Sequence, residues 1–273
     1  MQQLTMQFVG LLLWQVLIQC LAIFGIFFIL GFVLSQLARW TQINYLKSVG
    51  WKGILWTAWL GTPIHELSHL FFALIFLHRI EHVKMFKPNS ETGQLGQVDH
   101  SYSKDSFYQN LGNFFIGAGP MITGSILLVV LLYYLVPNGP QIFESLTTTQ
   151  VTLTNIFKSG ILIIIQLFTK ENFDAINFWL FLYVSFCIAS HMAPSWLDLK
   201  IMLKGLFLIV VLLITINYFA LALNLNFTDY ILNISSNLNI LVAIFTYATV
   251  ISLAHFILSS IILIPIAKLK YRH

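Results

Sequence analysis

The chain carries very little charge for its length. Only 9% of its 273 residues are Asp, Glu, Lys or Arg, against about 25% in an ordinary soluble domain. Hydrophobic residues make up 58%. This composition argues against a soluble globular domain and indicates a chain whose partner is the lipid bilayer. The net charge of +4 is what basic residues at the ends of membrane spans require, so we expect no nucleic-acid partner.

Cysteine and linker sequence are also scarce. The two cysteines, Cys20 and Cys187, both fall in apolar stretches, which argues against a disulfide framework and against a cysteine-based metal site. The sequence shows no low-complexity tract, internal repeat or linker, so we expect residues 1–273 to form a single membrane-embedded domain. The first apolar stretch is too long for the core of a secretory signal and is interpreted as an uncleaved span.

Long apolar stretches dominate the rest of the chain. Six of them are long enough, or nearly so, to cross about 30 Å of hydrocarbon. They comprise residues 8–37, 53–78, 111–136, 175–204, 205–224 and 237–267. The expected fold is therefore an all-α polytopic membrane protein with about six transmembrane helices. A shorter run, 156–168, is below the usual spanning length, and we expect it at the membrane interface.

The longest polar stretch, 79–110, has the composition of a β-hairpin in its middle. Residues 81–87 and 94–102 favour strands, and the turn-forming sequence Pro-Asn-Ser-Glu-Thr-Gly at 88–93 separates them. We therefore expect a small membrane-associated hairpin after the second span. The exposed edge of such a hairpin can pair with an extended peptide by strand addition.

The basic residues are distributed unevenly between the predicted loops. If both termini are inside, nine of the fourteen lie on the inner side, namely Arg79, Lys84, Lys87, Lys104, Lys200, Lys204, Lys268, Lys270 and Arg272. The outer side then holds Arg39, Lys47, Lys52, Lys158 and Lys170. Because cytoplasmic loops are enriched in Lys and Arg, we expect a multi-pass protein of a bacterial plasma membrane with both termini in the cytoplasm.

A polar cluster, His65-Glu66-Leu67-Ser68-His69, lies inside the second apolar stretch. Residues four apart on a helix point the same way, so His65 and His69 can present two imidazoles to one metal ion, with Glu66 beside them as a base. A carboxylate near the centre of a membrane helix costs roughly 2.5 to 3.5 kcal/mol on insertion scales. A bound Zn²⁺ reached by water is the simplest compensation for that cost.

A catalytic zinc ion usually takes three protein ligands, so the two histidines need a partner from elsewhere in the chain. The candidates are Asp198, His191, His255, Asp99 and His100. Asp198 matches best in depth, because it lies roughly 9 Å from the cytoplasmic end of its predicted span and His69 lies roughly 14 Å from its own. Pro194 is expected to break that span locally, beside a water-filled cavity.

Three segments carry a family resemblance. They are the helix with His65 and His69, the Gly-Ala-Gly-Pro sequence at 117–120, and the Ser-His-Met-Ala-Pro-Ser-Trp-Leu-Asp sequence at 190–198. Together they resemble the site-2 protease family of intramembrane zinc metalloproteases over about residues 53–204, the expected catalytic core. The resemblance implies that His65, His69 and Asp198 bind Zn²⁺ and that Glu66 activates a water. It also implies a membrane-protein substrate with a transmembrane segment.

The third segment departs from the family's pattern. Ser190 stands where the family usually has Asn, Pro194 is displaced by one residue, and Leu199 replaces a Gly, which bears on substrate positioning more than on the metal. Three other functions stay open: a catalytically silent relative acting as a binding or chaperone module, a metal or proton transporter, and a zinc peptidase with a downstream glutamate ligand. Retention of Glu66 weighs against a silent relative, and the lack of paired repeats weighs against a transporter. The downstream glutamates all lie in predicted polar segments, which weighs against the third function.

Overall fold

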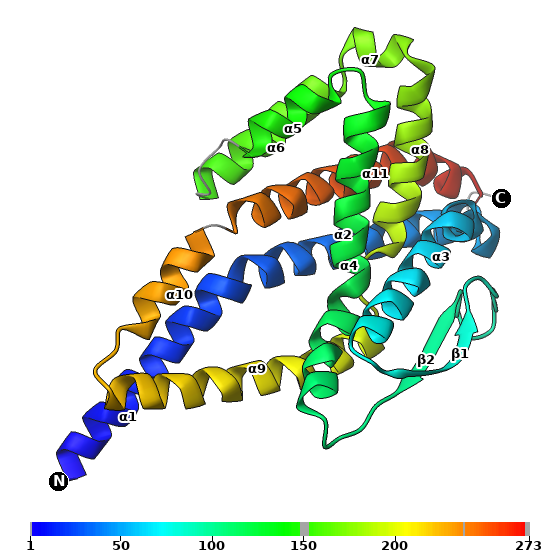
Figure 1. Ribbon diagram of the computed structural model, residues 1–273. Coiled ribbons are helices and arrows are strands. Elements are labelled where there is room, and N and C mark those ends of the chain that lie inside the picture. Colours follow the sequence, from blue (N-terminus) through cyan, green and yellow to red (C-terminus); the bar gives the residue numbers. More distant parts are fainter. Residues whose placement is uncertain (1, 148–152, 237, 271–273) are drawn as a thin grey trace.

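The computed structural model describes residues 2–147, 153–236 and 238–270, which are mostly helical (Figure 1). The elements before the sheet and the sheet itself are α1 (Gln2–Cys20), the π-helical turn η1 (Leu21–Gly25), α2 (Ile26–Ser48), α3 (Trp51–Ile75), β1 (Arg79–Lys84) and β2 (Gln97–Ser101). The later helices are α4 (Phe107–Leu135), α5 (Gly139–Thr147), α6 (Leu153–Leu167), α7 (Lys170–Asp174), α8 (Ile176–His191), α9 (Trp196–Ala222), α10 (Phe227–Ser236) and α11 (Asn239–Lys270).

Four helical stretches within the described residues are long and apolar enough to cross a membrane. They are Met6–Ser48, which joins α1, η1 and α2, and then α4, α9 and α11. The expected membrane class is thus supported, with fewer spans than the six predicted. The predicted second span does form a helix of 25 residues, α3, but its polar cluster lowers its hydropathy. The first span is longer than predicted, because the helix continues past residue 37 to Ser48.

The predicted boundary between the fourth and fifth spans, at 204/205, is wrong. Helix α8 ends at His191 after 16 residues, and α9 runs without interruption from Trp196 to Ala222. The break falls at 192–195 because Pro194 lacks a backbone N–H and Ser195 caps the new helix. The local break predicted at Pro194 is therefore confirmed. The boundary predicted at 204/205 failed because a hydropathy pattern does not register the capping by Ser195 that starts the new helix.

The long helices pack in pairs around one apolar core. Helix α11 lies along α2, α4 crosses α9 near the start of both helices, and α3 contacts both α4 and α8 (Figure 1). Fully buried side chains from α2, α4, α8 and α11 form the centre of this core, among them Leu34, Leu128, Phe178 and Ile251. Glycine permits the close contact between α3 and α8, because a Cβ atom on Gly61 would lie 2.7 Å from the His191 ring.

The predicted hairpin is present, with shorter strands than expected. Strands β1 and β2 pair antiparallel, Val83 lies opposite Val98, and a bulge interrupts the register between residues 80 and 82. The hairpin packs against the middle of α3: a Cβ atom on Gly96 would lie 2.7 Å from Cγ of Glu66 and 2.9 Å from Cγ2 of Thr62. This segment is therefore positioned to cover the polar cluster of α3.

The apolar run predicted at 156–168 forms α6, which spans 15 residues. Helix α6 contacts α5 and α11, and it buries Ile163 and Leu167 fully. It is shorter than the roughly 20 residues that a perpendicular span needs. Its placement at the membrane interface stays a prediction.

Candidate metal centre

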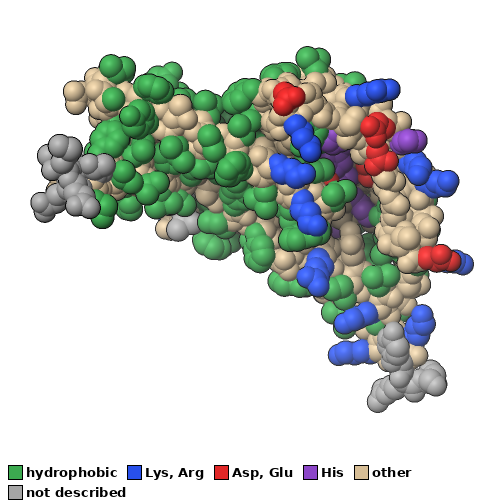
Figure 2. Space-filling model, turned by 90° about the horizontal axis from the view of Figure 1, so that it is seen from below, with side chains coloured by type: hydrophobic (Ala, Val, Ile, Leu, Met, Phe, Trp, Pro, Cys, Tyr) green, Lys and Arg blue, Asp and Glu red, His purple; other side chains and the backbone are tan. Residues whose placement is uncertain are grey.

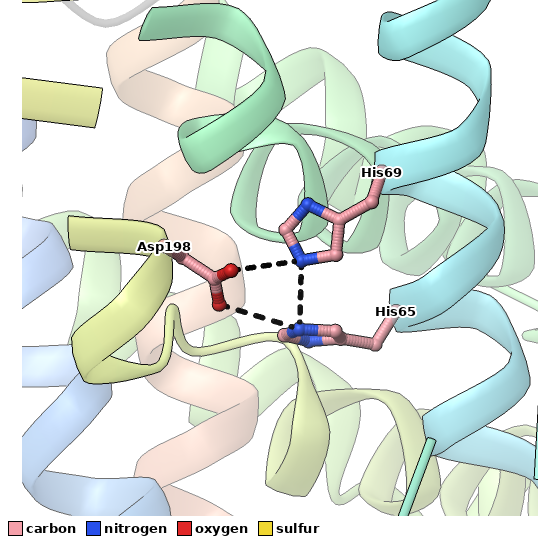
Figure 3. Close-up of side chains that lie close together, drawn as sticks. All are labelled: His65, His69 and Asp198. Atoms are coloured by element: carbon pink, nitrogen blue, oxygen red, sulfur yellow. Dashed lines mark hydrogen bonds and ion pairs between the residues drawn. The ribbon is translucent and has the colours of Figure 1, made fainter. Parts of the chain in front are cut away.

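Helix α3 and the first turn of α9 bring three predicted ligands together (Figure 3). His69 Nε2 lies 3.1 Å from His65 Nε2 and 3.2 Å from Asp198 Oδ1, while His65 Nε2 lies 3.5 Å from Asp198 Oδ2. His69 and Asp198 are buried, and His65 is partly exposed. Their ligand atoms all lie within 4.8 Å of one another, so this group can hold a metal ion.

A capping box at the start of α9 and the close approach of α4 fix Asp198 in this position. Asp198 is the third residue of the helix, where its Oδ2 accepts a hydrogen bond from Ser195 N at 2.7 Å while its own N donates to Ser195 Oγ at 3.2 Å. This reciprocal pair is a capping box. Helix α4 also approaches closely here, because Gly117 has no side chain: a Cβ atom there would collide with Asp198 O and lie 2.7 Å from Met202 N.

Backbone carbonyls determine which ring nitrogen of each histidine carries its proton. His65 Nδ1–H donates to His191 O at 2.6 Å, and His69 Nδ1–H donates to Ile116 O at 2.9 Å. A neutral imidazole has one N–H, so both Nε2 atoms present lone pairs. These two lone pairs face each other and the Asp198 carboxylate with no proton available between them. Converging acceptors of this kind call for a bound cation or for protonation of a ring.

The donor set fits a divalent transition metal. Two neutral imidazole nitrogens and one carboxylate oxygen are ligands that zinc accepts in catalytic sites, with its fourth position left to water or substrate. Ligand atoms at ~2.0–2.1 Å from a common ion, at tetrahedral angles, lie roughly 3.3 Å apart. The two Nε2 atoms, 3.1 Å apart, and His69 Nε2 with Asp198 Oδ1, 3.2 Å apart, lie close to that value, while His65 Nε2 approaches the other carboxylate oxygen, Oδ2, at 3.5 Å.

Glu66 lies beside the metal-capable group without being part of it. Its side chain is only 7% exposed, and the hairpin covers it at Gly96. Thr62, one turn earlier on α3, has a buried hydroxyl with no hydrogen-bond partner among the described residues. A carboxylate in this setting, next to a group that can bind a metal, is suited to exchange protons with a water or substrate held there.

A cavity of about 920 Å³ opens onto the group. Its walls come from α2, from the middle of α3, from hairpin residues 93–100 and from the 190–201 segment. Figure 2 shows histidine side chains inside a hollow on this face of the molecule, between groups of basic side chains. The metal-capable group thus lies on the wall of this cavity.

The structure excludes the other proposed third ligands from the group. The carbonyl of His191 accepts a hydrogen bond from His65, while its ring Nε2 is hydrogen-bonded to Thr57 Oγ1 at 3.1 Å. His255 links Ser190 Oγ, at 3.0 Å, and Tyr45 OH, at 3.1 Å.

Asp99 and His100 line the cavity on the hairpin side without joining the group. Asp99 accepts a hydrogen bond from Gln97 at 2.7 Å. His78 Nε2–H donates to Gln109 O at 2.8 Å, so His78 Nδ1 accepts a hydrogen bond from His100 Nδ1–H at 2.9 Å. Burial, followed by the neighbouring His78, lowers the pKa of His100 to about 4. The pair thereby links the end of α3 to strand β2 at neutral pH.

The cavity wall formed by α2 was not predicted. Ser35, Gln36, Arg39 and Gln42 all line the cavity, and their spacing of one, four and seven residues puts them on one helix face. That spacing was readable in the sequence within an otherwise apolar stretch. The distribution of basic residues placed Arg39 on the outer side, away from the hairpin, whereas the structure places Arg39 and hairpin residues 93–100 on the same cavity.

Comparison with known proteins adds no assignment. The chain matches no protein-family model, no curated protein and no solved structure. Two statements about class rest on the structure itself: a predominantly helical protein with helices that can cross a membrane, and a His–His–Asp group that can hold a metal ion.

Proposed function

We propose that the protein is an intramembrane zinc metalloprotease of the site-2 protease kind. It would hydrolyse a peptide bond within or beside the transmembrane segment of another membrane protein. The observation that carries this proposal is the convergence of three acceptor side chains, His65, His69 and Asp198, next to Glu66 in a cavity between apolar helices.

The residues of the site divide the chemistry between them. The two histidines and Asp198 would hold Zn²⁺, which when bound supplies a Lewis acid that polarises the scissile carbonyl and makes a coordinated water more acidic. Glu66 takes a proton from the attacking water and passes it to the leaving amine nitrogen. The carbonyls of His191 and Ile116 hold the two imidazole rings in the tautomer that this arrangement needs.

Strand β2 is the proposed holder of the unwound substrate. A helical segment must lose its internal hydrogen bonds before its carbonyls become accessible, and a strand edge replaces those bonds with intermolecular ones. Residues 97–100 of β2 line the cavity, which supports this role. We further propose that α3 and α8 lie in the bilayer with the four longer helical stretches, which restores six membrane segments.

Zinc content and cleavage, measured on matched variants, test the proposal. Purified wild-type protein is expected to hold about one zinc ion per chain, and His69→Ala to lose it, because one of three ligands is removed. Glu66→Gln is expected to keep its zinc and to lose turnover by about 10²-fold or more, because the amide accepts no proton. Metal is measured by mass spectrometry, and cleavage on a membrane-anchored reporter in detergent.

Each rival function predicts a different pattern in the same experiment. Full zinc content in His69→Ala overturns the ligand assignment. Unchanged cleavage by Glu66→Gln overturns the proposed role of that carboxylate. A wild-type protein that holds zinc, binds the reporter and never cleaves it would be a binding module, and zinc flux across proteoliposomes without cleavage would indicate a transporter.

A further inference from the structure

Helix α2 presents a single positive charge to the cavity. Among the described residues that line the cavity, Arg39 is the one Lys or Arg, while Glu66, Asp99 and Asp198 supply three carboxylates. Arg39 is exposed and makes no ion pair or hydrogen bond with any described residue. A guanidinium that served only to neutralise the site would pair with one of these carboxylates.

The orientation of α2 keeps Arg39 directed toward this space. Gln42 Nε2 donates to Ser190 O at 3.0 Å, which fixes the rotation of α2 relative to the 190–198 segment. Ser35, Gln36 and Arg39 lie within two turns of Gln42 on the same face and also line the cavity. The opposite face of α2 packs on α11, where Trp40 contacts Phe256 and Asn44 bonds Ser259. Arg39 therefore belongs to the wall of the cavity.

Arg39 differs from the other basic residue of the same helix. Lys47 lies in the last turn of α2, where a cation interacts favourably with the helix dipole, and it does not line the cavity. Arg39 lies nine residues before the end of α2, roughly 14 Å along the helix, where no such stabilisation operates. An unpaired guanidinium on the cavity wall is available to a polar partner, and its planar fork of donors suits a carboxylate.

We infer that Arg39 forms an anion-binding subsite that recognises a carboxylate on the substrate chain. This inference rests on the proposed protease function. An extended chain paired with β2 directs alternate side chains away from the hairpin, toward the wall that α2 provides. An Asp or Glu side chain, or the terminal carboxylate of the chain, would then meet Arg39. The subsite thereby selects substrates that carry one negative charge near an otherwise apolar segment.

Peptide binding to the full-length protein tests the subsite without requiring cleavage. The probes are fluorescent peptides of about 20 apolar residues in detergent micelles, matched in two pairs. One pair differs by Glu against Gln near the middle, and the other by a free carboxylate against a carboxamide at the end. Affinities are measured by fluorescence anisotropy for Arg39→Gln, Arg39→Lys and the control Lys47→Gln, all on the non-cleaving Glu66→Gln background.

With Arg39 present, we expect one charged peptide to bind about tenfold tighter than its uncharged partner, and the pair that shows the difference identifies the source of the carboxylate. Arg39→Gln should abolish this difference, Arg39→Lys should retain part of it, and Lys47→Gln should leave it unchanged. The inference is wrong if, with Arg39 present, the charged and uncharged peptides of both pairs bind with equal affinity. It is also wrong if Arg39→Gln weakens the binding of charged and uncharged peptides equally.

Two further measurements separate the alternatives. If Arg39→Gln weakens binding to phosphatidylglycerol vesicles and leaves the peptide differences intact, the ligand is a lipid headgroup and the inference is wrong. Zinc content and cleavage are measured in parallel on the Arg39 variants with Glu66 retained. If zinc content and cleavage are normal and the protein shows no preference for charged peptides, only the proposed subsite is wrong. If the protein prefers charged peptides and never cleaves the reporter, the proposed protease function is wrong and the subsite is retained.

Discussion

Backbone carbonyls orient the two histidines of the metal-capable group. The acceptor carbonyls of His191 and Ile116 hold both imidazole protons on Nδ1, which leaves both Nε2 lone pairs directed at Asp198. A different backbone path at either carbonyl would allow the other tautomer, and one histidine would then offer an N–H where a ligand atom is needed. The metal affinity of the site therefore depends on how α4 and α8 are packed as much as on its side chains.

Gly117 gives a test of that dependence at the scale of one methyl group. A Cβ atom there would collide with Asp198 O, so Gly117→Ala is expected to push α9 away from α4 and to move Asp198 out of the group. We expect a loss of about 1–3 kcal/mol in stability, together with weaker zinc binding. Thermal unfolding and zinc competition with a chelator measure the two effects.

Gly10→Ala is the matched control for this substitution. Gly10 also lies in a helix, but apart from its chain neighbours and the adjacent backbone of its own helix no atom lies within 4 Å of the position that a Cβ atom would take there, so the added methyl group meets no packed neighbour. Its zinc affinity should equal that of the wild type. Equal zinc affinity in Gly117→Ala would show that Asp198 tolerates displacement of α9 and would contradict the packing argument.

At the scale of elements, the hairpin is the part whose role can be separated from the metal. Proline has no N–H, so at an edge position of β2 it removes one donor that a substrate strand would use. Gln97→Pro and Val98→Pro are expected to reduce cleavage strongly in at least one variant while zinc content stays at the wild-type value. Asp99→Ala changes a side chain and retains the backbone donor, so it should reduce cleavage modestly at most. Normal cleavage by both proline variants would indicate that substrate is held elsewhere, along 190–198.

The link between α3 and β2 through His78 and His100 predicts a pH dependence. The pKa of His100 is lowered from 6.5 to about 4, so the unfolded chain binds a proton more readily than the folded hairpin. The stabilising contribution is complete above about pH 6.5 and is lost as the pH falls toward 4. Hydrogen exchange of residues 97–101 should accelerate between pH 7.5 and pH 5, after correction for the intrinsic rate. In His100→Gln, where His78 alone remains to titrate, exchange should differ less between the two pH values than in the wild type. An unchanged wild-type profile would contradict the assignment.

For the molecule as a whole, the parts of the fold that could be predicted are those that follow from short-range pattern. The i, i+4 spacing of His65 and His69 was sufficient to identify the helix that carries two residues of the metal-capable group, and the turn composition at 88–93 was sufficient to identify the hairpin. Pro194 was sufficient to predict a break near 192–195, whereas the uninterrupted run of α9 from Trp196 to Ala222 depends on capping by Ser195 and was not predicted. The position of Arg39 on the cavity wall depends on which face of α2 contacts α11, and no local sequence pattern specifies this tertiary contact.

The orientation of the whole molecule in its membrane remains a prediction, and the two ends of α3 provide the test. The positive-inside distribution favours a cytoplasmic location for the 79–110 region, hence for the loop that precedes α4. Ser103 is exposed in that loop, and Lys52 is exposed at the other end of α3, a helix of 25 residues. Ser103→Cys should therefore react with an impermeant maleimide only in inverted vesicles, and Lys52→Cys only in right-side-out cells. The wild-type chain is the control, because Cys187 is buried and Cys20 lies within an apolar helix. Labelling of Ser103→Cys from outside would show that the orientation is the reverse of the predicted one, with the cavity beside the metal-capable group open to the opposite side of the membrane.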